Sequence, residues 1–243
     1  GIGMSAIARY FKAKGFEVAG YDRTSTVLTR ELEAEGIKIN YVDEVEAIPS
    51  EFRINSDAEK TLNSQLSTLV VYTPAIPVDN KQYKYFLNNG FKMMKRAAVL
   101  GEITRLERGL CIAGTHGKTT TSTMTAHILK QSHVDCNAFL GGISKNYTIN
   151  LLLSDISDLV VIEADEFDRS FHHLAPHISV ITSMDPDHLD IYGTEEAYRE
   201  SFAHYASLVQ GALVVKKNIA SCFSPITSRL YTYAVGELAD FYA

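Results

Sequence analysis

The residues best suited to chemistry lie in one short stretch, segment 110–121, with the sequence LCIAGTHGKTTT. A short apolar run ends there at a glycine loop, and Lys118 and Thr119 open what the pattern predicts to be a helix. Glycines let backbone N–H groups turn toward an anion, the helix N-terminus adds partial positive charge, and Lys118 adds a full one. The Thr119 hydroxyl is placed where a phosphate-bound magnesium ion takes an oxygen ligand. The stretch therefore predicts a phosphate-binding loop.

The match to the P-loop pattern is partial. The full pattern has a glycine five residues before Gly117, and this chain has Ile112 there. The alternative is an ordinary glycine-rich turn capped by threonines. The order Gly-Lys-Thr directly after an apolar strand favours phosphate binding. The residues predicted to bind ATP are Gly114, Thr115, His116, Gly117, Lys118, Thr119 and Thr120.

Two further apolar strands are predicted to end in acidic clusters. Segment 158–162 runs into EADE at 163–166, and segment 178–182 runs into MDPDHLD at 184–190. Ligands of open parallel sheets bind beyond the carboxyl ends of the strands, so we expect both clusters to face one cleft with the loop. Alone, each cluster is better explained as a solvated strand end, but together with the loop they favour a magnesium–nucleotide site. The residues predicted to hold the metal are Thr119, Glu163 and His188. His188 would bind the ion directly or contact one of its ligands.

A second glycine-rich segment, GIGMSAIA, opens the chain and runs into a helix. A loop and helix between parallel strands require a strand before them, so we expect one ahead of Gly1. Gly1 and Gly3, with Asp22 at the end of the next predicted strand, fit a dinucleotide fingerprint. The same parts equally suit the diphosphate and base of another nucleotide. The pattern does not separate these two readings.

The elements that must position these residues alternate between apolar strands and helical spacing, which predicts an α/β fold with parallel sheets. We expect a small doubly wound sheet over residues 1–95 and a P-loop ATPase unit over residues 96–243, with the polar stretch 51–65 as a surface excursion. Strands are predicted at 17–21, 37–41, 68–72, 91–94, 158–162, 178–182 and 212–216, and helices at 26–35, 80–89, 96–108, 119–131 and 195–208.

The composition narrows the class of protein. With 243 residues, 46% hydrophobic and 21% charged, the chain has the make-up of soluble globular domains. No apolar run approaches the roughly 20 residues of a membrane span, and a net charge of -6 argues against a broad nucleic-acid surface. Its three widely spaced cysteines suit neither a metal pair nor a disulfide framework. We expect a cytoplasmic monomer or homodimer with neither nucleic acid nor membrane as partner.

Three motifs together resemble the Mur ligases of bacterial peptidoglycan synthesis: AGTHGKTTT at 113–121, EADEFDRSF at 163–171 and DHLDIYG at 187–193. Shorter segments, GIGMS at 1–5, TPAI at 73–76 and KRA at 95–97, sit where that family has related sequence. The second and third motifs favour the branch that adds L-alanine over the branch that recycles murein tripeptide.

The resemblance implies a UDP-binding Rossmann-like domain, an ATPase domain and a C-terminal Rossmann-like domain. It also implies ATP- and Mg²⁺-dependent ligation of L-alanine to UDP-N-acetylmuramate through an acyl phosphate. Lys118 would stabilise the transferring phosphoryl group, Thr119 and Glu163 would hold Mg²⁺, and His188 would hold a second ion or touch the reacting carboxylate. The residues implied to contact the UDP-sugar are Gly1, Gly3, Met4, Ser5, Asp22, Thr73, Arg96, His116, Asp165, Arg169 and Ser170.

The resemblance covers the family's first two domains, and we expect its C-terminal domain to be absent from these 243 residues. We therefore expect the 243-residue chain to retain UDP-sugar binding without completing turnover. The alternatives are a different ligase of the superfamily, such as a murein tripeptide ligase or a folylpolyglutamate synthase, and a P-loop switch protein. A switch protein leaves Asp187 and His188 unexplained. An NAD-dependent oxidoreductase built on Gly1, Gly3 and Asp22 makes no use of Lys118.

Overall fold

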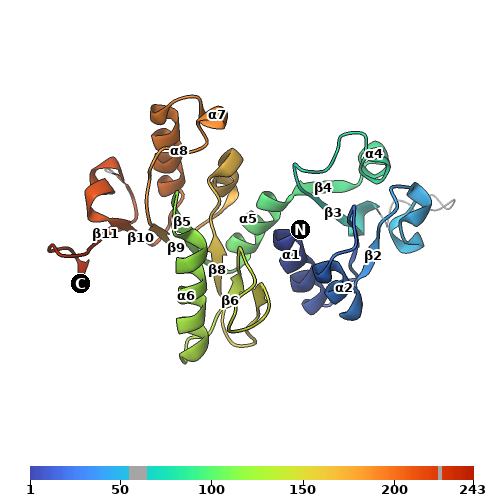
Figure 1. Ribbon diagram of the computed structural model, residues 1–243, viewed down its shortest axis with the longest axis horizontal. Helices are drawn as coiled ribbons and strands as arrows, with labels where there is room; N and C mark the ends of the chain where they lie inside the picture. Colours follow the sequence, from blue (N-terminus) through green and yellow to red (C-terminus); the bar gives the residue numbers. More distant parts are fainter. Residues whose placement is uncertain (55–64, 224–225) are drawn as a thin grey trace. The chain divides into compact units, whose positions relative to one another are not determined.

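A computed structural model of the chain describes residues 1–54, 65–223 and 226–243 (Figure 1). The chain divides into two compact units, Gly1–Val99 and Leu100–Ala243. Both units carry parallel strands connected through helices, which confirms the predicted α/β class. Most of the polar stretch 51–65 that we expect to be a surface excursion lies outside the described residues.

The first unit contains two separate two-stranded parallel sheets, in which β1 pairs with β2 and β3 pairs with β4. The single doubly wound sheet that we expected is therefore wrong for the described residues, because no ladder of hydrogen bonds joins one strand pair to the other. The strand expected ahead of Gly1 stays a prediction. The elements are α1 (Ile2–Ala13), β1 (Ala19–Tyr21), α2 (Val27–Ala34), β2 (Lys38–Asn40), η1 (Val45–Ala47), η2 (Ser50–Phe52), β3 (Leu69–Tyr72), α4 (Lys81–Asn88) and β4 (Lys92–Lys95).

Side-chain caps explain where the helices of this unit begin. The Thr26 hydroxyl accepts from the backbone N–H of Thr29, and the Asn80 side chain accepts from that of Tyr83, so each cap satisfies an N–H that lacks a partner within its helix. Arg9, only 7% exposed, ties α1 to the end of α2 through two hydrogen bonds of 2.7 and 3.0 Å to one carboxylate oxygen of Glu35.

The second unit is built on an eight-stranded sheet with the strand order β12-β11-β10-β9-β5-β8-β6-β7. All neighbouring strands are parallel except β6 and β7. In Figure 1, α6 runs alongside β5 and β8. The elements are α5 (Arg96–Leu106), β5 (Arg108–Ala113), α6 (Lys118–Gln131), β6 (Asn137–Phe139), β7 (Leu151–Leu152), β8 (Leu159–Glu163), η3 (Phe167–His173), β9 (Ile178–Ile181), α7 (Leu189–Tyr192), α8 (Glu195–Ser207), β10 (Ala212–Lys216), η4 (Lys217–Phe223), β11 (Arg229–Ala234) and β12 (Phe241–Tyr242).

Strand register brings the three polar strand ends to one edge of this sheet. β5 lies between β8 and β9, with Ile112 opposite Glu163 and Ala113 opposite Ile181. The loop after β5 and the acidic segments after β8 and β9 therefore start side by side. The prediction that these three segments share an edge is confirmed.

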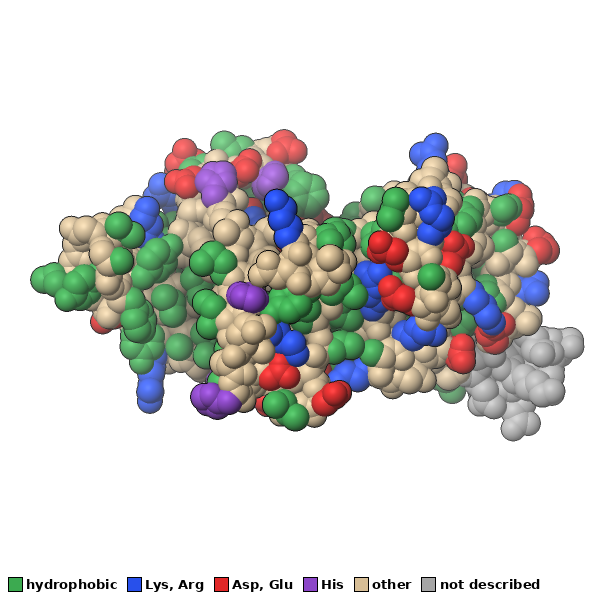
Figure 2. Space-filling model, turned by 60° about the horizontal axis from the view of Figure 1, so that its bottom comes forward, with side chains coloured by type: hydrophobic (Ala, Val, Ile, Leu, Met, Phe, Trp, Pro, Cys, Tyr) green, Lys and Arg blue, Asp and Glu red, His purple; other side chains and the backbone are tan. Residues whose placement is uncertain are grey.

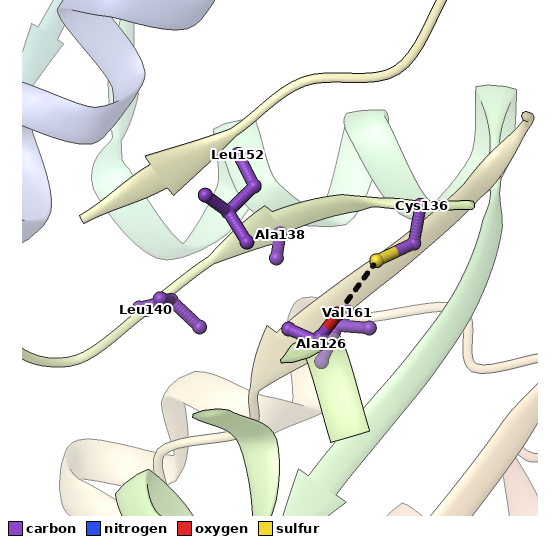
Figure 3. Close-up of a cluster of buried hydrophobic side chains, with 6 residues drawn as sticks. All are labelled: Ala126, Cys136, Ala138, Leu140, Leu152 and Val161. Atoms are coloured by element: carbon purple, nitrogen blue, oxygen red, sulfur yellow. Dashed lines mark hydrogen bonds between the residues drawn. The ribbon is translucent and has the colours of Figure 1, made fainter. Parts of the chain in front are cut away.

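Small side chains let α6 pack closely on the sheet (Figure 3). Ala126 of α6 is fully buried against Cys136, Ala138 and Val161, and the Cys136 thiol donates to the Ala126 carbonyl across 3.7 Å. Burial raises the pKa of the Cys136 thiol to about 11, so this thiol stays protonated and acts as a small apolar group at neutral pH. This close packing fixes the distance between the sheet and α6, the helix whose first residue is Lys118.

The surface carries both signs of charge, and Figure 2 shows acidic and basic side chains intermixed over the visible face. Within the described part of the chain, no helix combines the length and the apolar character that crossing a lipid bilayer demands.

Candidate nucleotide site

Glycine geometry shapes the loop between β5 and α6. Gly114 has φ +131°, and Gly117, the residue before α6, has φ +83°, both in the region that side chains avoid. A Cβ on Gly114 would lie 2.2 Å from the Thr182 hydroxyl oxygen. That hydroxyl holds the loop, because it lies 3.1 Å from the Ala113 carbonyl oxygen and 2.5 Å from the His116 carbonyl oxygen. The loop is therefore built against the end of β9.

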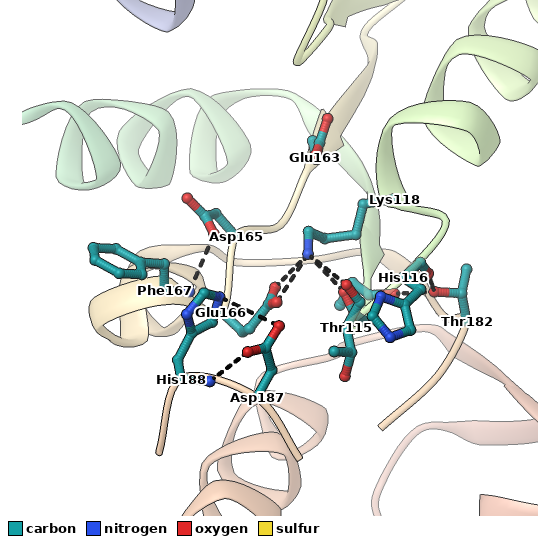
Figure 4. Close-up of polar contacts among 12 residues, drawn as sticks. Thr115, His116, Lys118, Glu163, Asp165, Glu166, Phe167, Thr182, Asp187 and His188 are labelled. Carbon is teal, nitrogen blue, oxygen red and sulfur yellow. Dashed lines mark hydrogen bonds and ion pairs between the residues drawn. The ribbon is translucent and has the colours of Figure 1, made fainter. Parts of the chain in front are cut away.

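Lys118 points back across this loop and meets a buried carboxylate (Figure 4). Its ammonium donates to the Gly114 carbonyl at 2.7 Å and to the Thr115 carbonyl at 3.4 Å. It also lies 2.9 and 2.7 Å from the two carboxylate oxygens of Glu166. Burial raises the pKa of Glu166, and the hydrogen bond from Lys118 opposes that rise. The ammonium is thus held by acceptors from three residues.

Glu166 is a residue of this site that the sequence pattern did not predict. It belongs to the predicted acidic cluster, but no role was assigned to it. Its only signal in the sequence is its place three residues after Glu163, and nothing there shows that it pairs with a lysine 48 residues away.

Thr119 and Glu163 come together as predicted. The Thr119 hydroxyl lies 2.9 and 3.1 Å from the two Glu163 carboxylate oxygens. Neighbouring ligands of an octahedral magnesium ion, each about 2.1 Å from the metal, lie about 3 Å apart. A hydroxyl and a carboxylate are also the hard oxygen ligands that this ion prefers. The pair therefore fits Mg²⁺.

His188 occupies a different position from that pair. It adopts a left-handed conformation with φ +53°, and its ring lies edge-on to Phe167 at a centroid distance of 5.3 Å. Its Nε2 is 3.8 Å from an Asp187 carboxylate oxygen. Among the described residues, no group of three or more histidine, cysteine or acidic side chains is arranged to hold a metal. A metal-binding role for His188 stays a prediction.

The other predicted ATP-binding residues follow the loop, and their protein contacts limit how they can meet a ligand. The Thr115 hydroxyl lies 2.7 Å from the Asp185 carbonyl oxygen and 2.8 Å from the Tyr198 hydroxyl, in a buried contact. His116 is exposed, and its backbone N–H donates to the Ser183 hydroxyl at 2.9 Å. Thr120 is exposed in the first turn of α6.

The segment after β8 carries three of the residues predicted to contact a sugar nucleotide, Asp165, Arg169 and Ser170. Asp168 and Arg169 have φ values of +51° and +55°, a rare conformation for two consecutive non-glycine residues. The Arg169 guanidinium lies over the Tyr192 ring, 4.7 Å from its centre. The Asp165 carboxylate accepts from the Phe167 backbone N–H at 3.1 Å. Backbone strain and a cation–π contact therefore fix the direction of Arg169.

The first unit gathers its own predicted sugar-nucleotide residues around the start of α1. The helix begins at Ile2, so Gly3, Met4 and Ser5 lie in its first turn, which corrects the expected glycine loop. The backbone N–H groups of Met4 and Ser5 both donate to the Gly1 carbonyl at 3.1 Å, which is why the segment is helical from its start.

Arg96, Asp22 and Thr73 approach the same end of the unit. A Cβ on Gly3 would lie 2.6 Å from a guanidinium nitrogen of Arg96, so the glycine makes room for that side chain. The Asp22 carboxylate lies 3.4 Å from the Gly1 nitrogen. Tyr72 pairs with Lys95, so Thr73 and Arg96 follow their strands at the same sheet edge.

Two family models match the chain. The model of the Mur ligase family catalytic domain covers residues 1–108, and that of the Mur ligase middle domain covers residues 112–239.

Among curated proteins, the chain is 57% identical to the UDP-N-acetylmuramate–L-alanine ligase of Porphyromonas gingivalis W83, with 100% of the chain and 52% of the relative aligned. It is 59% identical to the protein of the same name from Parabacteroides distasonis, with 100% and 51% aligned. The chain therefore spans about half the length of these curated relatives.

Among solved structures, the UDP-N-acetylmuramate–alanine ligase of Thermotoga maritima matches with a TM-score of 0.78 and 25% identity, over 98% of this chain and 51% of that one. A UDP-N-acetylmuramate:L-alanyl-γ-D-glutamyl-meso-diaminopimelate ligase from Neisseria meningitides also matches with a TM-score of 0.78. Its identity is 23%, over 95% of this chain and 74% of that chain, so it supports the fold alone.

Proposed function

Because this chain belongs to the Mur ligase family, we propose that it forms the substrate-binding part of a UDP-N-acetylmuramate–L-alanine ligase that uses ATP and Mg²⁺. Residues 1–95 bind the UDP-sugar in this proposal, and residues 96–243 bind ATP. The choice of substrates rests on the names of the two curated relatives, which are more than half identical to the whole chain. A cytoplasmic location and a monomeric or homodimeric state remain predictions from the sequence.

The observation that carries the proposal is the arrangement at the start of α6. The Lys118 ammonium lies at the loop, and the next residue, Thr119, contacts the Glu163 carboxylate at 2.9 Å. Phosphoryl transfer requires mainly positioning and compensation of negative charge, which a lysine and a magnesium pair supply. Bound Mg²⁺ would add positive charge at the phosphate oxygens, with Thr119 and Glu163 as its protein ligands.

The reaction has two steps. A carboxylate oxygen of the muramoyl group attacks the γ-phosphorus of ATP, the bond to the β,γ-bridging oxygen breaks, and ADP leaves. The L-alanine amine then attacks the carbonyl carbon of the acyl phosphate, the amide bond forms, and phosphate leaves as the amine loses a proton. Lys118 stabilises the charge on the phosphoryl oxygens in the first step.

The test measures phosphate release by a chain extended to the length of its curated relatives. Release is expected to require UDP-N-acetylmuramate, ATP and L-alanine together. Release that depends on a murein tripeptide in place of L-alanine would contradict the proposed substrate, and release without any amine would indicate a simple nucleotidase.

Calorimetry on the 243-residue chain provides a second test. We expect the calorimetric titration to show that this chain binds UDP-N-acetylmuramate. In a separate phosphate assay we expect the same chain to show no L-alanine-dependent release. Binding of NAD in place of the UDP-sugar would refute the proposal.

A further inference from the structure

Glu166 stands in an unusual position for an acidic residue, because it is almost completely buried next to the proposed phosphate-binding lysine. Its side chain is 2% exposed, and that of Lys118 is 15% exposed. Burial of a carboxylate is costly unless it is paired and hydrogen-bonded. Lys118 donates to one Glu166 carboxylate oxygen at 2.9 Å and lies 2.7 Å from the other. That second oxygen is buried and accepts no hydrogen bond from the described residues, so the ammonium charge alone compensates it.

The main chain holds Glu166 in place independently of Lys118. The Tyr192 hydroxyl donates to the Glu166 carbonyl at 2.5 Å, and the Arg169 backbone N–H donates to the same carbonyl at 3.0 Å. Tyr192 is itself buried and packs edge-on against Tyr198 at 4.9 Å. The carboxylate therefore projects from a rigid support.

An ammonium group has three N–H donors. At Lys118 the distances from the nitrogen to its acceptors are unequal. The contacts to the Gly114 carbonyl and the Glu166 carboxylate are 2.9 Å or shorter, whereas the contact to the Thr115 carbonyl is 3.4 Å. The Thr115 contact is the weakest of the three, so it is the one that a phosphate oxygen exchanges most readily.

We propose that Glu166 is a positioning residue for Lys118. The Glu166 carboxylate fixes the Lys118 ammonium over the loop, and the N–H that contacts the Thr115 carbonyl stays available to donate to a phosphate oxygen. A lysine side chain is flexible and loses much rotational freedom on binding. The contacts with Glu166 and the Gly114 carbonyl restrict the Lys118 side chain before ATP binds, so binding costs less of this rotational freedom. This inference rests on the proposed function, in which Lys118 meets the transferring phosphoryl group.

The test is a double-mutant cycle in the ligase extended to the length of its curated relatives, with Glu166→Gln, Lys118→Met and both together. Glu166→Gln keeps the shape and an acceptor oxygen but removes the charge that anchors the ammonium. Misplacing a catalytic group by about 1 Å costs roughly 100-fold in rate, so kcat is expected to fall by that order while KM for ATP stays unchanged or falls. In the Lys118→Met background, Glu166→Gln is expected to change kcat by less than about 2-fold, because residues that act as a unit are not additive.

Two further variants separate positioning from folding. Glu166→Asp restores the charge one methylene short of the ammonium, so kcat is expected to stay low. Asp158→Asn removes an exposed carboxylate that pairs with Arg108 at 2.6 Å, and it is expected to keep wild-type kcat. A structural role alone for Glu166 predicts instead a lower unfolding midpoint, a raised KM and an additive cycle.

The outcomes distinguish this inference from the proposed function. If the wild-type enzyme releases no phosphate with UDP-N-acetylmuramate and L-alanine, the proposed function is wrong. If the wild-type enzyme is active but the cycle is additive, or Glu166→Gln keeps full kcat, the positioning role alone is overturned.

Discussion

A methyl group added at Gly141 is expected to weaken magnesium-dependent nucleotide binding while leaving the fold intact. In Gly141→Ala the new Cβ would lie 2.0 Å from one Glu163 carboxylate oxygen and 2.8 Å from its carboxyl carbon. Non-bonded atoms settle at about 3.5 Å, so the carboxylate must retreat by more than about 1 Å. Mg²⁺ tolerates little deviation from its ligand distances of about 2.1 Å. The variant thus removes Glu163 from Thr119 without removing either side chain.

The expected loss of Mg-ATP affinity is roughly 10- to 100-fold, the range seen when the support of a metal ligand is removed. That range corresponds to about 1.4–2.8 kcal/mol. The free energy of unfolding should change little, because the group that moves is the end of a flexible side chain and alanine lowers the entropy of the unfolded chain. Calorimetric titration with Mg-ATP, and with ATP in EDTA, measures the affinity, and urea unfolding measures stability.

Gly142→Ala is the matched control, since its Cβ would meet only a Thr119 methyl group at 3.8 Å, an ordinary contact. It should bind Mg-ATP like the wild-type chain. Equal affinities for Gly141→Ala and the wild type in the presence of Mg²⁺ would refute the assignment of Glu163 as a metal ligand. An equal loss with EDTA would show that the methyl group acts on the loop rather than on the metal.

Two further predictions concern stability. Gly101→Ala should lower the free energy of unfolding by roughly 1–3 kcal/mol, because the new Cβ would lie 2.3 Å from the His173 carbonyl oxygen. The higher helix propensity of alanine, worth about 1 kcal/mol, opposes this loss. Urea unfolding measures the change. Asp135→Asn should flatten the acid side of the stability profile. Burial opposes the shift, but hydrogen bonds led by that from Lys130 lower the pKa of Asp135, so its carboxylate stabilises the fold above the unfolded-state value of about 4 and that contribution is lost as the pH falls through the lower folded value.

Each of these has an internal control. Ala98→Gly measures the effect of helix propensity in α5 and should lower the free energy of unfolding by about 1 kcal/mol. If Gly101→Ala instead raises the free energy of unfolding, the His173 carbonyl moves away from the new Cβ at little cost and the prediction is wrong. Asp155 is exposed and follows Ser154, whose hydroxyl donates to the Asp135 carboxylate at 2.6 Å, and Asp155→Asn should keep the wild-type acid profile. The free energy of unfolding of Asp135→Asn should fall below that of wild type at pH 7 and approach it as the pH falls. Identical unfolding curves at pH 7, or a difference that is the same at pH 7 and in strong acid, would contradict the assigned role.

Local patterns in the sequence predicted most of the elements that position the site. Strand β5, the glycine loop and the start of α6 follow from the apolar run, the two glycines and the Lys-Thr pair. The parallel register of β5, β8 and β9 follows from the order of strands and helices, so the contact between Thr119 and Glu163 could be predicted.

The remaining parts depend on interactions that no local pattern contains. Strands β6, β7 and β12 have only two or three residues each, too few for a period to appear, and they form because the edges of longer strands are available. β11 was missed because its run RLYTYA lies in an aromatic tail with turn residues. The Lys118–Glu166 ion pair and the contact of Thr115 with Tyr198 depend on tertiary packing.

The separation in sequence between the partners of the site has a consequence for the order of folding. Thr119 and Glu163 are 44 residues apart, Lys118 and Glu166 are 48 apart, and Thr115 and Tyr198 are 83 apart. Contacts across such separations form only after the entropy of closing long loops has been overcome. The site therefore cannot assemble from one locally folded segment. A nucleotide analogue whose fluorescence changes on binding would mark the completion of folding of this unit during refolding, after its helices have already formed.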